Sequence, residues 1–219
     1  MRLHLVLEGT SSPIPFNYQH KLTGVLHKWL GQNDLHDKIS LYSFSQLDGG
    51  KAQNGHLNFE YGGKWFISIW EKQYAKQLID GIQRDPDMFL GLQVREVILQ
   101  EDPDLSEKTF FQVASPVHIK HTEERTVRFI LFNDPTSTDY LTATLKHKMK
   151  QAGMPEDETL NVRFDTSYPK AKTKLITYKD VKNKCNWCPI IIEGKPESKA
   201  FAWNVGVGNS TGIGFGAIK

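Results

Sequence analysis

The order in which hydrophobic periodicity changes along residues 1–100 is the feature that most constrains the fold. Residues 2–7 alternate apolar and polar side chains, which is typical of a half-buried strand. From residue 17 the apolar side chains recur every three to four positions, which predicts a helix that ends near Gly31. Further patterns follow in the order strand, strand, helix, strand, at residues 41–47, 64–70, 71–82 and 91–100. This β-α-β-β-α-β order is typical of a ferredoxin-like unit.

The same order recurs, less regularly, after an acidic stretch that contains Pro103 and predicts a linker at residues 101–112. The second half is expected to hold strands, a helix, strands, a short helix and a last strand, at residues 113–120, 126–132, 138–152, 160–165, 174–179, 187–193, 197–205 and 216–218. We therefore predict an α+β protein of two tandem ferredoxin-like, RRM-like βαββαβ domains, at residues 1–100 and 113–219. Residues 9–15 are expected to form a loop.

A glycine-rich run, VGVGNSTGIGFGAIK, occupies residues 205–219. Glycine accepts positive φ and adds no side-chain bulk, so such a run lets backbone N–H groups converge on an anion, most often a phosphate. The alternative is a tight connection into a last strand. The run lacks the lysine that the phosphate-binding motif GxxxxGK[ST] requires. A dinucleotide-binding fingerprint requires a helix after its glycines, and no helix is expected after this run. These exclusions favour a phosphodiester backbone over a nucleotide cofactor. The candidate phosphate-binding residues are Gly206, Gly208, Asn209, Ser210, Thr211, Gly212 and Gly214.

The charge balance leaves any basic surface local. The 27 basic and 25 acidic residues give a formal net charge of +2, which by itself indicates no nucleic-acid partner. Lysines concentrate between residues 168 and 184, however, close to the glycine run. Among them, Lys170, Lys172 and Lys174 are candidates to contact a phosphodiester backbone, although such a run is often only a solvated face.

The cysteines and the paired histidines do not predict a metal site. Cys185 and Cys188 form a CxxC, but no second Cys/His pair stands at finger-like spacing. His118 and His121 flank a predicted strand without a neighbouring carboxylate pair. We therefore expect no metal or other cofactor, and reduced structural cysteines. The short polar start and the absence of a run of about 20 apolar residues predict a soluble cytoplasmic protein.

The motif GVGNSTGIGFGAI resembles the terminal glycine-rich motif of the CRISPR repeat-processing endoribonucleases of the RAMP superfamily. FNYQHKLTGVLHKWL, LHDKISLYSFS and ASPVHIK are similar to further blocks of the same family. The resemblance covers most of the chain in order. It implies tandem ferredoxin-like domains and metal-independent cleavage of CRISPR precursor RNA within each repeat, which releases guide RNAs.

The resemblance also implies where the chemistry takes place. Cleavage without metal uses the neighbouring 2′-hydroxyl as nucleophile and leaves a 2′,3′-cyclic phosphate and a 5′-hydroxyl. Histidine suits the proton transfers, because its pKa lies near neutrality, and lysine suits the oxyanion. His36, just after the first helix, matches the position of the family's catalytic histidine, with Lys38 as phosphate support. His27 stands where some relatives have a tyrosine and is the candidate for the second proton transfer; Tyr18 and Tyr42 are weaker candidates.

Two other functions stay open. The chain can be a non-catalytic RNA-binding subunit of a CRISPR effector complex, since that role needs the fold and the glycine motif but not His36. A generic RRM-like binder is disfavoured, because the sequence has no RNP1-type aromatic cluster. The expected partners are CRISPR repeat RNA, other effector subunits and a second copy of the chain.

Overall fold

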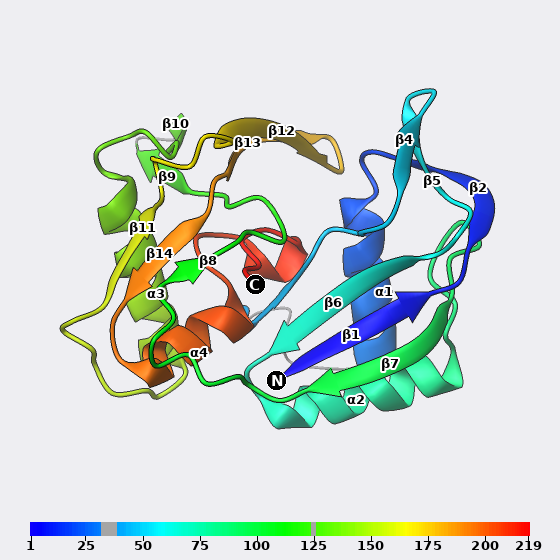
Figure 1. Cartoon of the computed structure of the whole chain (residues 1–219), viewed down its shortest axis with the longest axis horizontal. Helices are drawn as coiled ribbons and strands as arrows, with labels where there is room; N and C mark the ends of the chain where they lie inside the picture. Colours follow the sequence, from blue (N-terminus) through cyan, green and yellow to red (C-terminus); the bar gives the residue numbers. More distant parts are fainter. Residues whose placement is uncertain (32–38, 124–125) are drawn as a thin grey trace.

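The computed structural model describes residues 1–31, 39–123 and 126–219, and Figure 1 shows two α+β units side by side. The elements of the N-terminal unit are β1 (Arg2–Leu7), β2 (Thr10–Pro15), α1 (Gln19–Leu30), β3 (Tyr42–Phe44), β4 (Lys51–Gln53), β5 (His56–Phe59), β6 (Gly63–Ile69), α2 (Lys72–Arg84) and β7 (Val94–Gln100). Those of the C-terminal unit are β8 (Phe110–Phe111), β9 (Lys120–Glu123), β10 (Thr126–Phe129), α3 (Ser137–Gln151), β11 (Asn161–Phe164), β12 (Lys172–Tyr178), β13 (Val181–Trp187), β14 (Ile190–Glu193), α4 (Pro196–Val205) and the 3₁₀ turn η2 (Thr211–Ile213).

The N-terminal sheet has the strand order β3–β6–β1–β7, and every neighbouring pair is antiparallel. Because β1, β3, β6 and β7 are the first to fourth strands of the predicted unit, this is the ferredoxin-like order. Both α1 and α2 lie on the same face of the sheet, behind it in Figure 1. The periodicity of the first 100 residues therefore predicted this unit correctly.

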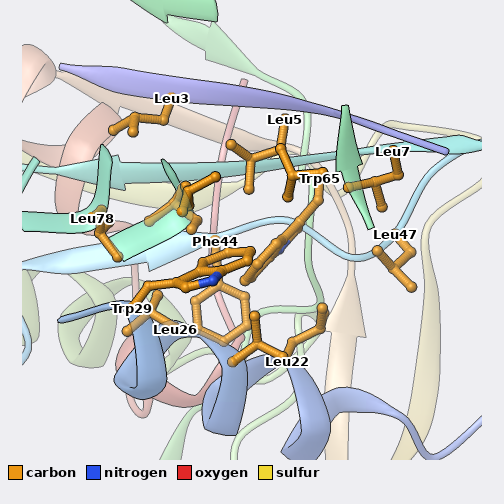
Figure 2. Close-up of a cluster of buried hydrophobic side chains, with 14 of the residues drawn as sticks. Leu3, Leu5, Leu7, Leu22, Leu26, Trp29, Phe44, Leu47, Trp65 and Leu78 are labelled. Carbon is orange, nitrogen blue, oxygen red and sulfur yellow. The ribbon is translucent and has the colours of Figure 1, made fainter. Parts of the chain in front are cut away.

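The core of this unit fills the space between the sheet and α1. In Figure 2 the leucines of β1 point toward α1, with Trp29 of α1 and Trp65 of β6 between them. The centroids of the two indole rings lie 6.0 Å apart. Their N–H groups donate to the carbonyls of Asp85 and Ser45, so burying these rings leaves neither donor unsatisfied. Gly81 lets α2 approach α1, because a Cβ there would lie 2.2 Å from the carbonyl oxygen of Trp29.

The C-terminal sheet repeats the same order with a shorter ladder. Its strands are ordered β11–β14–β8, and all pairs are antiparallel. The last residues of the chain lie beside the residues that follow β8. Ile218 bridges Val113 there, and the backbones of Lys219 and Gln112 exchange two hydrogen bonds. The position of a fourth strand is thus occupied, as predicted, by the residues after the glycine run. The whole chain has the fold of two tandem ferredoxin-like units.

Several strands differ from the sequence predictions. Residues 9–15, predicted as a loop, contain β2, which pairs with β5 through an irregular register typical of a proline-bearing edge. Residues 113–120, predicted as one strand, form only isolated bridges before β9, with Pro116 among them. The lysine- and asparagine-rich strand β13 was missed, because it lacks the apolar alternation of a half-buried strand.

The strand β8 bears on where the second unit starts. It falls inside the predicted linker, residues 101–112, and pairs with β14. We therefore propose that the second domain, predicted at residues 113–219, includes β8.

Arg2 makes buried contacts that join the two units. Its side chain is 3% exposed and lies between the rings of Phe66 and Trp203. The guanidinium donates to the hydroxyl of Ser68 and to the carbonyls of Trp203 and Ile218. Arg2, Ser68 and Phe66 belong to the N-terminal unit and the other two residues to the C-terminal one. The second unit therefore packs, around Arg2, on the face of the N-terminal sheet opposite α1 and α2.

Candidate functional site

The glycine-rich loop, residues 206–216, needs its glycines in order to fold back on itself. Gly206, Gly208, Gly214 and Gly216 all have positive φ, between 69° and 90°. The amide of Val207 donates to the carbonyl of Gly216 over 2.9 Å, which closes the loop. A Cβ at position 216 would lie 1.9 Å from the carbonyl oxygen of Val207, so only glycine fits there.

Many of the loop amides bind protein rather than a ligand. Those of Gly206, Asn209 and Gly214 donate to the carbonyls of Ala202, His118 and Thr211. The side-chain oxygen of Asn209 accepts from the amide of Lys120 over 2.9 Å. These amides are engaged within the protein, as a tight connection into the last residues of the chain requires. The phosphate-binding role of residues 206–214 stays a prediction.

One side of the loop borders a pocket of about 370 Å³, here called the loop pocket. The loop contributes residues 208–211 to its lining, and α3 contributes Thr144, His147 and Lys148. Ile39 and Ser40, which precede β3, line the opposite wall. The N-terminal and the C-terminal unit thus both contribute to this pocket.

The N-terminal unit holds the loop from two directions. At the start of α1, the amide nitrogen of Gln19 donates to the carbonyls of Ile213 and Gly214, each over 2.9 Å. Before β3, the side chain of Ser40 lies so close to Gly212 that a Cβ there would be 2.1 Å from its hydroxyl oxygen. The hydroxyl of Tyr42 donates to the carbonyl of Gly212 over 3.3 Å. The sequence did not predict these contacts, because they join residues about 170 to 195 positions apart.

Lys148 is a site residue that the sequence interpretation missed. Its side chain is 3% exposed, and its Nζ lies 2.9 Å from the hydroxyl of Thr211 and 3.3 Å from the carbonyl of Val205. Burial lowers the pKa of Lys148 from 10.5 to about 7. A signal was present in the sequence, since Lys148 continues the helical stripe of Leu141 and Leu145, where a charged residue is unexpected.

The family of the chain follows from its C-terminal half. A family model described as CRISPR associated protein Cas6, C-terminal, matches residues 99–219, more than half of the chain and including the glycine-rich loop. The chain belongs to the Cas6 family. The resemblance seen in the glycine motif is thereby confirmed. No curated protein sequence matches the chain.

Solved structures of the same fold agree with this assignment. The chain is similar to a CRISPR associated protein Cas6, with a TM-score of 0.85 and 19% identity, covering 100% of this chain and 98% of that one. It is similar to the product of a Cas6-related gene from Pyrococcus furiosus (TM-score 0.84, 20% identity, 100% and 97% covered). It is also similar to a RAMP protein binding different RNA substrates (TM-score 0.86, 18% identity, 100% and 98% covered). At these identities the likeness establishes a common fold over the full length of the chain.

The catalytic candidates of this Cas6-family chain lie on and just after α1. His36 and Lys38 fall outside the described residues. The next residues in the chain, Ile39 and Ser40, line the loop pocket. His27 is a half-buried residue of α1, two turns beyond Gln19, and is not among the residues that line the pocket.

The tyrosine candidates are buried within the N-terminal unit. Tyr18 accepts a hydrogen bond from the amide of Leu47, and Tyr42 donates to Gly212. Burial raises the pKa of each phenol to about 12. Neither phenol is therefore suited to exchange a proton near neutral pH.

The predicted lysines lie on and beside the β12–β13 hairpin, away from the loop pocket. Lys170 and Lys172 are exposed, whereas Lys174 is half-buried with its Nζ 3.7 Å from the centre of the Trp187 ring. Trp187 also borders a second hollow of about 480 Å³ between the two units, which is lined in part by His4, Lys64 and Lys219. Through its contact with Trp187, Lys174 thus connects the hairpin to the rim of this interdomain cleft.

The remaining titratable candidates are part of the core. His118 is 2% exposed and packs between the rings of Phe129 and Phe215, and burial lowers its pKa to about 4. Cys185 and Cys188 are buried free thiols, and burial raises the pKa of each to about 12. Over the described residues, no three His, Cys, Asp or Glu side chains gather in a geometry that can hold a metal ion. In the same part of the chain, no helix is long and apolar enough to span a membrane.

Proposed function

We propose that this Cas6-family chain cleaves CRISPR precursor RNA within its repeats and so releases guide RNAs. The 2′-hydroxyl beside the scissile phosphate loses its proton to a base and attacks phosphorus. The bond to the 5′-oxygen breaks, and an acid protonates that oxygen. The products are a 2′,3′-cyclic phosphate and a 5′-hydroxyl.

The observation that carries this proposal is the loop pocket, which a single loop and both units build together. Hydroxyls of Ser210 and Thr211 and an imidazole, that of His147, border it, so it offers hydrogen-bond donors suited to a phosphate. Its opposite wall begins at Ile39, the residue bonded to Lys38. A phosphate in the pocket would therefore lie beside Ile39 and Ser40, which follow shortly after His36 in the sequence.

The proposed roles follow from the chemistry of each residue. His36 is the general base or acid, and Lys38 supports the charge on the phosphorane. His27 is the candidate for the second proton transfer. The loop residues hold phosphates near the scissile bond, with Gly208, Ser210, Thr211 and Gly212 as the positions whose amides are not engaged in the contacts described above.

The rest of the RNA is proposed to follow the basic hairpin and the interdomain cleft. Lys170 and Lys172 are exposed and can pair with phosphates, whereas Lys174 holds the face of Trp187. Binding should weaken steeply as salt rises, because phosphate contacts release counterions. Changing Lys170 and Lys172 together to Gln should reduce the slope of log Kd against log salt by about two.

Cleavage of a labelled repeat RNA in EDTA tests the proposal, with the wild type beside His36→Ala and the control His56→Ala. His56 is a suitable control because it lies on β5, outside the lining of the loop pocket. We expect the wild type and the control to cut, and His36→Ala to be slower by at least about 100-fold, the scale of a lost general acid or base. Equal rates for His36→Ala and the wild type would remove His36 from the mechanism.

The second candidate function is that of a non-catalytic RNA-binding subunit of a CRISPR effector complex. The similarity to a RAMP protein binding different RNA substrates favours it, since RNA binding needs only this fold and its surfaces. Tight binding of repeat RNA by a wild-type protein that does not cut it would select this function. In either case the proposed partners are CRISPR repeat RNA, effector subunits and a second copy of the chain.

A further inference from the structure

A buried amine lies directly beneath the loop pocket. Lys148 projects from α3 and donates to the Oγ1 of Thr211, 2.9 Å away, and to the carbonyl of Val205, 3.3 Å away. Thr211 is itself 1% exposed and lines the pocket. A lysine that accepts such burial needs a compensating interaction, because a desolvated ammonium without a counter-ion is unfavourable.

No carboxylate of the described residues forms an ion pair with Lys148. The loop and its flanks, residues 205–218, carry no ionisable side chain. On α3 itself His147 lines the same pocket, and Lys146 pairs with Glu158. Tyr42, on the N-terminal side, stays neutral up to high pH because burial raises its pKa to about 12.

Charged side chains on the other elements packed against α3 have partners or positions away from Lys148. On β11, Arg163 lies 3.7 Å from a carboxylate oxygen of Glu193. On α4, Lys199 donates to the carbonyl of Ser106, and Glu197 lies in the first turn, whereas Lys148 reaches the last residue of that helix. Asp34, His36, Asp37 and Lys38, which adjoin Ile39, lie outside the described residues. Within the described part of the chain, the pocket is thus the place from which a counter-charge can reach Lys148.

A hydrogen bond from Thr211 can connect such a counter-charge to Lys148. When Lys148 carries its proton, the ammonium only donates, so Oγ1 of Thr211 is then the acceptor in this contact. The hydroxyl hydrogen of Thr211 is then left to donate to another group, and the positive charge behind it makes it a stronger donor. A phosphate oxygen in the loop pocket is an acceptor of the required sign.

We propose that Lys148 is a positioning residue that acts through Thr211, so that the glycine-rich loop binds an RNA phosphodiester in the loop pocket. The inference rests on the proposed RNA function of the same site and adds the residue that sets its affinity. Burial lowers the pKa of Lys148 to about 7 in the absence of RNA, and the bound phosphate raises it again. Binding is therefore tighter below neutral pH than above it.

The test measures binding of a repeat RNA that carries a 2′-deoxynucleotide at the cleaved position, so that no cutting occurs. For the wild type, the Kd should rise about five-fold between pH 7 and pH 8, as expected for a group that takes up one proton with a pKa near 7. Calorimetry in two buffers of different ionisation enthalpy should report the same proton uptake. Lys148→Met should bind more weakly at pH 7 and should lose this pH dependence and the proton uptake.

Two further variants make the result specific. Lys150→Met removes an exposed lysine from the same helix, outside the lining of the loop pocket, and should keep the wild-type pH dependence. Thr211→Val keeps the side-chain shape and should reproduce the loss seen in Lys148→Met. The double variant should then lose no more than either single one, because both remove the same interaction.

Wild-type pH dependence in Lys148→Met, or additive losses in the double variant, would overturn the inference. If Lys148→Met does not fold, Thr211→Val is the deciding variant: loss of the proton uptake on RNA binding supports the inference, and wild-type proton uptake overturns it. Cleavage is read separately. A wild type that binds with these properties but never cuts overturns the proposed nuclease and leaves the inference standing. A wild type that cuts, with Lys148 variants that bind as it does, overturns the inference alone.

Discussion

The stability of the RNA-free protein should depend on pH through Lys148, and Lys148→Met should remove that dependence. Methionine keeps the length of the side chain and its packing but has no charge. Burial lowers the pKa of Lys148 from 10.5 to about 7. At about 1.4 kcal/mol per pH unit, the charged amine is disfavoured in the folded state by on the order of 5 kcal/mol.

The sign follows from proton linkage. Between about pH 7 and pH 10.5 the unfolded chain holds a proton on Lys148 that the folded chain does not, so the free energy of unfolding rises with pH in that window. The full penalty is present below pH 7 and disappears above about pH 10.5. Between pH 9.5 and pH 7 the wild type should therefore lose about 3 kcal/mol relative to Lys148→Met.

Urea unfolding followed by tryptophan fluorescence at several pH values measures this difference, with Trp29 and Trp65 as buried reporters. The lost hydrogen bonds to Thr211 and Val205 shift the stability of the variant equally at every pH, so they cancel. Lys150→Met serves as the control and should follow the wild type. Free energies for Lys148→Met and the wild type that stay parallel within about 0.5 kcal/mol would refute the reasoning.

Four other substitutions test the fold. Gly216→Ala places a Cβ 1.9 Å from the carbonyl oxygen of Val207 at a φ of 69°, so a melting experiment should show a loss above about 2 kcal/mol. Gly24→Ala, with nothing within 4 Å, should instead gain about 0.5–1 kcal/mol. Burial acts to raise the pKa of Asp157, but four hydrogen bonds lower it to about 2. Between pH 5 and pH 2 the free energy of unfolding of the wild type should therefore fall by about 2 kcal/mol more than that of Asp157→Asn. Arg2→Met leaves two interdomain carbonyls without their donor and should cost about 2–4 kcal/mol by urea unfolding; an unchanged midpoint would show that Arg2 does not hold the units together.

The helices and the order of the long strands were predictable because they follow local periodicity. The inward stripe Leu141, Leu145 and Met149 located α3 to within one residue at each end. β8 was not predictable, since it has two residues and its partner β14 lies far along the chain. β13 pairs with the adjacent strand β12, but its lysine- and asparagine-rich residues lack the apolar alternation that predicts a strand. The roles of His36 and Lys38 stay predictions that rest on the family resemblance.

The sequence by itself determined the architecture and the family, because periodicity and a glycine motif are local properties of the chain. Only the tertiary structure decided that the glycine-rich loop is held by α1 and β3, and that Lys148 lies beneath it. A lysine is charged and exposed in an extended chain, and the helical stripe of Leu141 and Leu145 indicates only which face of α3 Lys148 lies on, not what packs against that face. Its proton affinity is set by the water that Val205, Thr211 and their neighbours exclude once the two units have packed together.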